Sequence, residues 1–549
     1  MRGPGAVGWV ALVLGAGAAA AVLLTWPLVR APDAMILDDS TLDGFQFVWN
    51  SWWVRRAVHD GTNPFYTHLL FAPQGIGLFW HTLGLTTGLL SIAFARGDDF
   101  AHAVWAHNAT NLAAVPATVA LVALLVQRLV GRPGVAAVAG LVAVASPFYA
   151  RQLHGPHLGA LWAIALVLLA WQALLARRTW PAGVAAVAAF VVLFGASQDY
   201  AAMALVVCAV DLVVRAVSRG TRRRIFGAAV VLACVVAVIM LAAHVLGSEL
   251  PERPPFRWIV WNSAYLSGFV TPPWLGMARP WLYFESSIYL GLVPLVGAGL
   301  AQIVAPREAA RWNLAALACL TIALGPMLQL GPPSPDLYRL PGDAPPVWPG
   351  WPMPYRLLYD LVPGFAMSRG PWRWVGGARL CLVLATACGL GVLARRASWR
   401  TATGVGLALV VASFAETLPH RLHAVAAIMP SGYRVLENDP GDYVVVDLPS
   451  GLRRGSFALF SSYYMAYQTG HHRPLVDGTV ARLPGARRHL FERIDFRLAD
   501  HPEVRYVVLH RALFRQVYPR GPSVRLAKEA RASGRLVYRD RQVRVYRMR

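Results

Sequence analysis

Long apolar segments recur along the chain and alternate with short polar stretches. Runs of about 18 or more apolar residues are typical of transmembrane helices. The pattern predicts a polytopic α-helical membrane protein with about eleven spans. The predicted spans cover residues 8–28, 100–127, 133–150, 157–176, 181–197, 199–216, 225–247, 286–304, 312–331, 376–394 and 401–418. The apolar segment 81–95 is short for a span, and we expect it to be interfacial or re-entrant.

The pattern changes beyond residue 425, where the long apolar runs end. Stretches rich in β-branched residues are typical of strands, and the last of them looks like a hairpin. These stretches lie at 441–451, 504–511 and 535–548, and a segment with helical spacing covers 485–501. The sequence therefore predicts a transmembrane domain over 1–424 and a small soluble α/β domain over 425–549.

The composition supports a membrane protein and narrows the function classes. Of the 549 residues, 56% are hydrophobic and 14% are charged, and the mean hydropathy is +0.46. A soluble chain carries roughly a quarter charged residues. The net charge is +23, but the basic residues are dispersed among the apolar segments and form no basic tail. We therefore expect no nucleic-acid partner and attribute the charge to contacts with membrane lipids.

The basic residues also predict an orientation. Cytoplasmic loops are enriched in arginine and lysine. The arginine-rich loops share one side if the N-terminus is inside and 81–95 does not span. The outer side then carries the large loop 30–99, the loops 248–285 and 332–375, and the domain 425–549. The bias toward arginine and alanine indicates a bacterial protein, and we expect it in the cytoplasmic membrane with these parts facing the periplasm.

The outer loop 30–99 holds the most distinctive polar cluster. Residues 37–53 read LDDSTLDGFQFVWNSWW and contain Asp38, Asp39 and Asp43. Acidic side chains next to a membrane are costly, which favours a function for them. For Asp38 and Asp39, capping of a helix explains the residue equally well. Asp43 is therefore the strongest of the three candidates for catalysis.

Helical spacing predicts a helix over residues 43–59 with two distinct faces. Asp43, Gln46 and Asn50 share one face at positions i, i+3 and i+7. The other face is aromatic and consists of Phe45, Trp49 and Trp52. We expect the aromatic face to lie in the membrane interface. The polar face then points into a cavity or toward protein.

With these features the chain resembles the GT-C superfamily of integral membrane glycosyltransferases. The layout is similar: one helix, a large acidic outer loop, many spans and an outer C-terminal domain. Two segments carry the resemblance, DGFQFVWNSWWVRRAVHDGTNPFYTHLLFAPQGI and VVVDLPSG…YYMAYQTGHHRPLVDGTVAR. They are similar to a bacterial and archaeal branch of the superfamily. The tandem Asp-Glu of the protein mannosyltransferase branch is not found, and Asp38 and Asp39 stand roughly in its place.

The resemblance implies transfer of a sugar from a polyprenyl-phosphate donor to a lipid, glycan or protein acceptor outside the membrane. One carboxylate of Asp43, Asp39 or Asp38 would deprotonate the acceptor hydroxyl. The predicted substrate contacts are Gln46, Asn50 and His81. If a divalent ion such as Mg or Mn takes part, its ligands would come from Asp38, Asp39 or His81.

The departing lipid phosphate requires positive charge on the outer side. The stretch MSRGPWRW (367–374) places Arg369 and Arg373 four residues apart, just before a span. On a helix they would share a face, and bidentate guanidinium contacts suit phosphate. The alternative is that both side chains snorkel at the helix end.

Two other function classes stay open. A carrier, or a flippase for lipid-linked saccharides, would need ionisable residues in mid-span and inverted repeats. The middle parts of the spans are nearly free of charge and no repeat is evident, so the sequence disfavours this class. A non-catalytic envelope assembly protein would use the domain 425–549 for binding. No Gly-x-x-x-x-Gly-Lys-Ser/Thr loop is present, which argues against an ATP-driven transporter.

Overall fold

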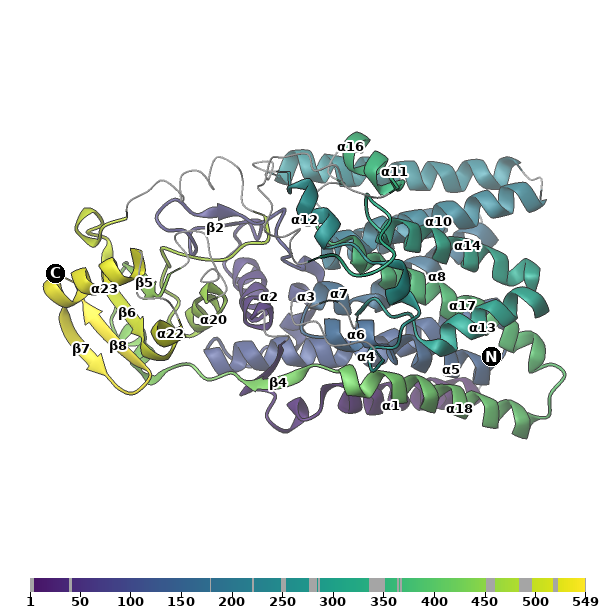
Figure 1. Cartoon of the computed structure of the whole chain (residues 1–549), viewed down its shortest axis with the longest axis horizontal. Helices are drawn as coiled ribbons and strands as arrows, with labels where there is room; N and C mark the ends of the chain where they lie inside the picture. The colour runs from purple at the N-terminus through teal and green to yellow at the C-terminus, as the bar shows by residue number, and fades with distance from the viewer. Residues whose placement is uncertain are drawn as a thin grey trace. The chain divides into compact units, whose positions relative to one another are not determined.

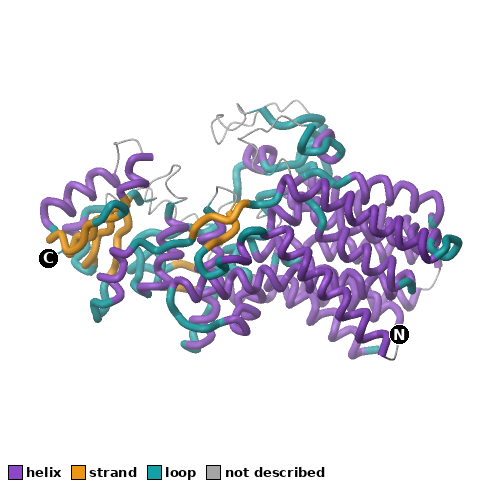
Figure 2. Tube along the Cα trace, turned by 90° about the horizontal axis from the view of Figure 1, so that it is seen from below, coloured by secondary structure: helices purple, strands orange, loops and turns teal. Residues whose placement is uncertain are grey.

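The computed structural model describes most of the chain. The described residues are 4–38, 42–177, 179–219, 222–247, 253–275, 284, 287–334, 351–362, 365, 368–450, 460–482, 496–516 and 522–548. Contacts divide the chain into two compact units. The helical unit comprises Met1–Trp26, Asn111–Met240 and Arg253–Leu422, and the mixed unit comprises Pro27–Thr110, Leu241–Glu252 and His423–Arg549. Within the described residues, the named strands all belong to the mixed unit (Figure 2).

Each predicted span overlaps a helix. These helices are α1 (Pro4–Thr25), α4 (Phe100–Val130), α5 (Pro133–Val144), α8 (Leu161–Arg177), α9 (Trp180–Ala196), α10 (Gln198–Arg219), α11 (Arg222–Leu246), α13 (Leu292–Val304), α14 (Pro306–Ala323), α17 (Val375–Leu393) and α18 (Trp399–Thr417). Among the described residues, 7 helical stretches are long and apolar enough to cross a membrane. The chain is therefore a multi-helix membrane protein, whereas its exact number of spans and its orientation stay predictions.

The segment 81–95 forms only short helices. Helix α3 (Leu85–Leu90) continues into a 3-10 turn, Ser91–Phe94. Ten helical residues extend about 15 Å, half of the roughly 30 Å of a hydrocarbon core. Leu89 and Leu90 are 41% and 47% exposed. This short apolar surface agrees with an interfacial segment.

Helix α17 is the most enclosed of the candidate spans, with 89% of its apolar window buried. It packs against α5, α13 and α14. Its glycines allow close packing, because a Cβ at Gly389 would meet Ala301 of α13 at 2.7 Å and one at Gly376 would meet the ring of Phe148, in helix α6 (Pro147–Gln152), at 2.7 Å. Small residues serve the same purpose at helix interfaces in membranes generally. Helix α11 is the opposite case, since only 6% of its window is buried, as expected of a lipid-facing helix.

The predicted spans contain several charged residues, and the contacts of Asp211 and Arg379 show how two of them are accommodated. Asp211 of α10 is 1% exposed and pairs with Arg215 at 2.9 Å and Arg311 at 3.3 Å. Arg379 of α17 is 3% exposed and donates to the carbonyl oxygens of Val142 and Ala143, both at 3.0 Å. Arg379 thereby satisfies the carbonyls at the end of α5. Both charges are paired within the helical unit and hold helices together.

The mixed unit contains the predicted α/β element. Its main sheet has the order β5-β6-β8-β7, formed by β5 (Val444–Leu448), β6 (Val504–His510), β8 (Val543–Arg547) and β7 (Arg535–Arg539). Strands β5 and β6 are parallel, and β7 and β8 form the predicted hairpin (Figure 1). The predicted helix over 485–501 lies mostly outside the described residues. Two short sheets complete the unit: β1 (Met35–Asp38) pairs with β4 (His423–Ala426), and β2 (Tyr66–Thr67) with β3 (Ile76–Gly77).

A helix covers each face of the main sheet. Alternate side chains of a strand point to opposite faces, so Val445 and Val508 join one core while Val446 and Val507 join another. The second core is completed by helix α23 (Pro522–Ser533) through Leu526. The first core includes helices α2 (Asp43–His59) and α20 (Ser461–His471), which pack against each other. The contacts thus group the outer loop with the C-terminal region, a grouping that the predicted boundary at 425 does not express.

Candidate active site

Helix α2 has the bounds predicted from the sequence and begins at Asp43. Leu42 immediately before it has φ 64°, in the left-handed region. This conformation costs a non-glycine residue about 1–3 kcal/mol and is concentrated at functional sites. Asp43 is partly buried at this strained helix start. Asp39 lies outside the described residues, so its role stays a prediction.

Asp38 supports the start of α2. It is the last residue of β1 and is 7% exposed. Its Oδ1 accepts a hydrogen bond from the Gly44 N–H at 3.4 Å, which is how a capping carboxylate satisfies a helix N-terminus. A Cβ at Gly44 would collide with the carbonyl oxygen of Leu37. Glycine at this position therefore lets the first turn of α2 lie directly against β1.

Gln46, Asn50 and His81, the three predicted substrate contacts, meet in one place; we name them the amide–histidine cluster. His81 Nε2 lies 3.0 Å from Asn50 Oδ1 and 3.1 Å from Gln46 Nε2. Asn50 Nδ2 donates to the Thr82 carbonyl at 2.9 Å, and Gln46 Nε2 donates to the Thr479 carbonyl at 3.3 Å. The three side chains are 1–6% exposed. The cluster therefore fastens two separate chain segments to α2.

The hydrogen bonds of His81 define its protonation. Its Nδ1 accepts the Ala481 N–H at 2.9 Å. A ring nitrogen that accepts carries no proton, so the neutral imidazole holds its proton on Nε2 and donates it to Asn50 Oδ1. Both nitrogens are thus engaged, and neither offers a lone pair to a cation. His81 does not fit the metal-ligand role predicted for it. Among the described residues, no three potential ligands of the His, Cys, Asp and Glu types are grouped.

The aromatic face of α2 is buried in protein, so its predicted membrane-interface role is wrong. Trp49 and Trp52 are 0% exposed. Trp49 Nε1 donates to Gln468 Oε1 at 2.7 Å, and Trp52 Nε1 donates to Asp98 Oδ1 at 2.9 Å. Phe45 packs on Tyr463 with ring centroids 4.4 Å apart. Two of these partners, Gln468 and Tyr463, belong to α20. The aromatic face of α2 is therefore the surface that contacts α20, a helix far away in the sequence.

The two segments that carry the GT-C resemblance lie side by side in the mixed unit. Leu475 donates its N–H to the Leu69 carbonyl at 2.9 Å and accepts the Ala72 N–H at 2.9 Å. Gln468 of α20 donates to the Leu69 carbonyl at 2.7 Å. Backbone pairing and the amide–histidine cluster together join 69–82 to 475–481.

Asp477, in the second of these segments, is a buried polar residue that the sequence reasoning missed. It is 9% exposed, and its Oδ2 accepts hydrogen bonds from Ser461 at 2.8 Å and Ser450 at 3.2 Å. Its Oδ1 accepts the Gly478 N–H at 2.7 Å. The run LVDGT held the signal, since an acid between apolar residues and glycine is typical of a turn with a structural carboxylate.

Arg373, predicted to bind phosphate, forms an ion pair. Its Nη1 lies 2.8 Å from Asp199 Oδ2, and Ser368 Oγ donates to the other oxygen of Asp199 at 2.9 Å. Arg373 belongs to a 3-10 turn, Pro371–Trp374, whereas Arg369 precedes that turn. The predicted common helical face is therefore wrong. The carboxylate of Asp199 neutralises Arg373, which weakens the case for Arg373 as a phosphate ligand.

A second polar cluster lies at the carboxyl ends of the parallel strands β5 and β6. Tyr433 donates its hydroxyl to Asp447, and His510 Nε2 lies 3.1 Å from Asp447 Oδ1 and 3.0 Å from the Tyr433 hydroxyl. The three residues are 0–5% exposed, and burial raises the pKa of Tyr433 well above its usual value. The sequence showed an acid and a histidine at two strand ends, but not that those strands are neighbours.

Comparisons with known proteins bear on the fold. No protein-family model matches the chain, and no curated protein matches its sequence. The structure is similar to the crystal structure of the oligosaccharyltransferase from Archaeoglobus fulgidus tethered with an acceptor peptide containing the NVT sequon. The TM-score is 0.50 at 13% identity, and the match covers 91% of this chain and 69% of that chain. Oligosaccharyltransferases of this kind are GT-C glycosyltransferases. This chain has the GT-C fold.

Two further structures of the Archaeoglobus enzyme match with lower scores. The apo form gives a TM-score of 0.49 at 13% identity and covers 91% of this chain and 69% of that chain. AglB in complex with an inhibitory peptide and a dolichol-phosphate gives 0.46 at 14% identity and covers 96% and 72%. The match with the peptide-tethered structure confirms the resemblance recognised from the two sequence segments as a likeness of fold. The roles of individual site residues stay predictions.

Proposed function

We propose that the chain is a membrane glycosyltransferase that moves a hexosyl or pentosyl unit from a polyprenyl-phosphate donor to a lipid, glycan or protein acceptor. The observation that carries the proposal is the start of α2. Asp43 stands there after the left-handed Leu42, while Asp38 and the amide–histidine cluster fix the first two turns of the helix. This arrangement lies in a chain with the GT-C fold.

Asp43 is the proposed general base. Its carboxylate takes the proton of the acceptor hydroxyl as the acceptor oxygen bonds to the anomeric carbon of the sugar. The bond between that carbon and the phosphate oxygen breaks, and the electron pair leaves with the lipid phosphate. Arg369 is the proposed cation that stabilises the departing phosphate. A peptide is tethered to the oligosaccharyltransferase of similar fold, which supports including proteins among the acceptors.

The amide–histidine cluster has a positioning role in this proposal. His81 donates to Asn50, and the three residues also bind backbone groups of Thr82, Thr479 and Ala481. A side chain whose hydrogen bonds are already made holds its surroundings in place and has little left for a substrate. Asp38 likewise serves the helix start. His81 offers no lone pair to a metal, so the carboxylates of Asp38 and Asp39 are the predicted ligands that remain, and the divalent ion stays a prediction.

The topology belongs to the proposal as well. Eleven spans, with the N-terminus inside and residues 425–549 outside, would place the start of α2 on the periplasmic side of a bacterial cytoplasmic membrane. The concentration of arginine in loops such as 215–224 and 395–400 supports this orientation. Reporter fusions after Arg224 and at the C-terminus test it, and a cytoplasmic C-terminus would overturn it.

The reaction is tested with purified protein in nanodiscs. A panel of polyprenyl-phosphate sugars is supplied together with a cell-envelope extract as the acceptor source, and release of polyprenyl phosphate is measured by mass spectrometry. Loss of a general base lowers the rate by about 10²–10⁴-fold. We expect a loss of this size in Asp43→Asn and an unchanged rate in Asp33→Asn, which alters an exposed acid of the same unit.

The outcomes test the role of Asp43 and the glycosyltransferase activity separately. Full activity in folded Asp43→Asn would remove Asp43 from the mechanism but leave the glycosyltransferase in place. Absence of release from every donor, with a folded wild-type protein, would reject the donor class.

A further inference from the structure

One edge of the main sheet carries a large excess of positive charge. Residues 523–547 cover most of α23 and the β7–β8 hairpin and contain eight basic and two acidic side chains. The sheet order places β7 at one end, and among the described residues β7 pairs only with β8 (Figure 1). An edge strand presents a row of backbone N–H and C=O groups that a further strand can bind. We name residues 535–541, which comprise β7 and the start of the hairpin turn, the basic edge.

Like charges face each other across this hairpin. Arg539 lies opposite Arg544, and Arg535 lies opposite Arg547. Like charges directly opposite each other destabilise an antiparallel pair of strands. Asp439 lies 3.9 Å from Arg547 and relieves one pair in part, whereas neither Arg539 nor Arg544 forms an ion pair with the residues that the structure describes. An anion at the basic edge would therefore remove a repulsion that the fold itself leaves in place.

The two acidic side chains of this region serve the fold and do not neutralise the basic edge. Asp540 Oδ1 accepts the N–H groups of Gln542 and Val543 at 2.7 and 2.6 Å, and its Oδ2 accepts the Tyr538 hydroxyl at 3.1 Å. Glu529 of α23 accepts a backbone N–H of another segment at 3.0 Å. Asp540 thus closes the hairpin turn, and Glu529 fastens α23.

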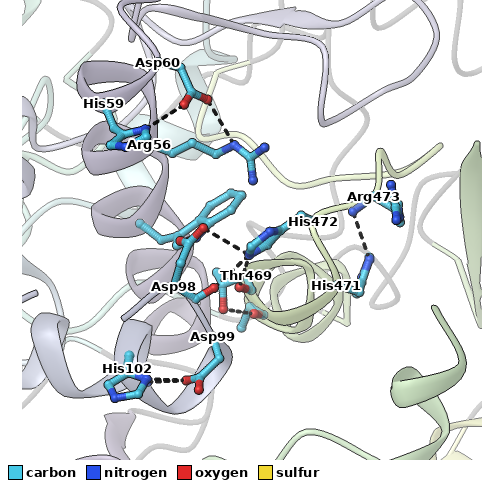
Figure 3. Close-up of polar contacts among 12 residues, drawn as sticks. Arg56, His59, Asp60, Asp98, Asp99, His102, Thr469, His471, His472 and Arg473 are labelled. Carbon is cyan, nitrogen blue, oxygen red and sulfur yellow. Dashed lines mark hydrogen bonds and ion pairs between the residues drawn. The ribbon is translucent and has the colours of Figure 1, made fainter. Parts of the chain in front are cut away.

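The arginines of the basic edge are exposed and available. Arg535, Arg539 and Arg541 form no ion pair within the described part of the chain. Arg56, in α2 of the same unit, shows the opposite arrangement, because its Nε lies 3.4 Å from Asp60 Oδ2 (Figure 3). Three neighbouring guanidinium groups can therefore each take a carboxylate from outside the chain.

Two apolar side chains lie between these charges. Leu536 and Val537 are 44% and 37% exposed. A strand rises about 3.3 Å per residue, so the backbone positions of Arg535 and Arg539 are roughly 13 Å apart. An extended segment of about seven residues could lie along β7 with acidic side chains at both ends and apolar ones in the middle.

The charge determines what kind of strand can bind here. A second copy of this chain would place its own arginines against the basic edge, and like charges disfavour that pairing. An acidic segment reverses the sign of the interaction and also supplies backbone groups at strand spacing. The headgroup of an anionic lipid, or an anionic glycan, supplies the charge alone. The combination of a free strand edge, exposed apolar side chains and unpaired arginines therefore favours a protein segment.

We propose that the basic edge binds an extended acidic segment of a partner protein, which adds a strand to β7 and places its carboxylates on Arg535, Arg539 and Arg541. The proposal goes beyond the transfer reaction and does not depend on it.

Binding is measured on the full chain in nanodiscs of zwitterionic lipid, with the fluorescein-labelled peptide Glu-Glu-Val-Thr-Val-Glu-Glu as the probe. Fluorescence anisotropy gives the affinity, and hydrogen exchange reports amide protection at 535–539. We expect saturable binding that weakens with added salt, together with slower exchange in β7. The double variant Arg535→Glu/Arg539→Glu should bind about tenfold more weakly and should prefer the peptide with lysine in place of glutamate. Arg515→Glu, which alters an exposed arginine outside the basic edge, should bind as wild type does.

The controls separate an added strand from simple attraction of charge. A peptide that is N-methylated at alternate residues keeps its carboxylates but loses backbone donors, so it should bind at least about tenfold more weakly and leave exchange in β7 unchanged. The double variant places opposite charges across β7 and β8, and we expect it to fold.

Each remaining outcome would overturn the proposal. Equal affinity of the methylated and unmodified peptides would reduce the interaction to charge. Equal affinity of wild type and the double variant would remove the arginines from it. Binding of phosphatidylglycerol vesicles or polygalacturonate without binding of the peptide would assign the basic edge to another anion, and absence of binding by every probe would reject the docking surface.

Discussion

His81 and Ala481 are 400 positions apart in the chain and are joined by a hydrogen bond of 2.9 Å from the Ala481 N–H to His81 Nδ1. This bond connects the loop 30–99 to the C-terminal region inside one compact unit. It also fixes the tautomer of His81 and thereby its bond to Asn50. From the sequence, His81 was predicted to contact the substrate or a metal. In the structure it joins a distant segment of the chain to helix α2 through these two hydrogen bonds.

Replacing His81 by phenylalanine should destabilise the protein. The change leaves the Ala481 N–H and Asn50 Oδ1 without partners, and each buried unpaired group costs about 1–3 kcal/mol. We expect a loss of about 2–4 kcal/mol in thermal unfolding of the purified protein, with faster hydrogen exchange at 479–482. His59→Phe is the control, because the His59 side chain is 89% exposed. Equal unfolding temperatures for the two variants would contradict the positioning role.

Adding a single methyl group at Gly44 should disrupt the start of α2. A Cβ there would collide with the carbonyl oxygen of Leu37, a backbone atom that cannot move aside alone. We expect Gly44→Ala to lower the unfolding temperature and the transfer rate together, although alanine favours helix by about 1 kcal/mol. Gly404→Ala in α18 meets no atom within 4 Å and should be neutral or stabilising. A Gly44→Ala protein as stable as Gly404→Ala would show that α2 does not need this close approach.

Local patterns in the sequence predicted local structure well. The bounds of α2, the helices in the spans and the β7–β8 hairpin all follow from residue periodicity and propensity. These patterns do not predict what a helix face packs against. The aromatic face of α2 could pack in a membrane interface or against another helix of the same chain. The hydrogen bond from Trp49 to Gln468 shows that it packs against another helix. That pairing depends on contacts across hundreds of residues, which periodicity does not encode.

Trp49→Phe tests the buried role of this aromatic face. The variant leaves Gln468 Oε1 without its 2.7 Å donor in a fully buried place. We expect a loss of about 1–3 kcal/mol of unfolding free energy. Trp180→Phe is the control, since Trp180 is 80% exposed. An interfacial anchor at Trp49 would instead weaken membrane association and leave the unfolding temperature near that of the control.

Arg369 and Arg373 should respond differently to substitution. Arg373 is held by Asp199 at 2.8 Å in a poorly exposed site, so Arg373→Gln should destabilise the helical unit. A double-mutant cycle with Asp199→Asn should show a coupling of about 1–3 kcal/mol. Arg369→Gln should raise KM for the donor or lower kcat. Loss of donor affinity in Arg373→Gln alone would assign the phosphate to Arg373 instead.

His471 should make the free energy of unfolding fall as the pH is lowered, and substitution of His471 should abolish this contribution. Burial lowers its folded-state pKa to about 3, below the ordinary 6.5. Below pH 6.5 the unfolded chain takes up a proton at this residue and the folded chain does not. Stability is therefore full above pH 6.5 and declines as pH falls toward 3, by at most about 1.4 kcal/mol per pH unit.

The measurement is the difference in unfolding free energy between wild type and His471→Gln from pH 7.5 to pH 4.5. Carboxylates such as Glu437 titrate in both proteins and cancel in this difference. We expect wild type to lose roughly 2–3 kcal/mol relative to the variant by pH 4.5. His59→Gln, which alters an exposed histidine, should follow wild type throughout. Parallel curves for wild type and His471→Gln would mean that the ring takes up its proton in the folded state as readily as in the unfolded chain, so burial would not lower the pKa of His471.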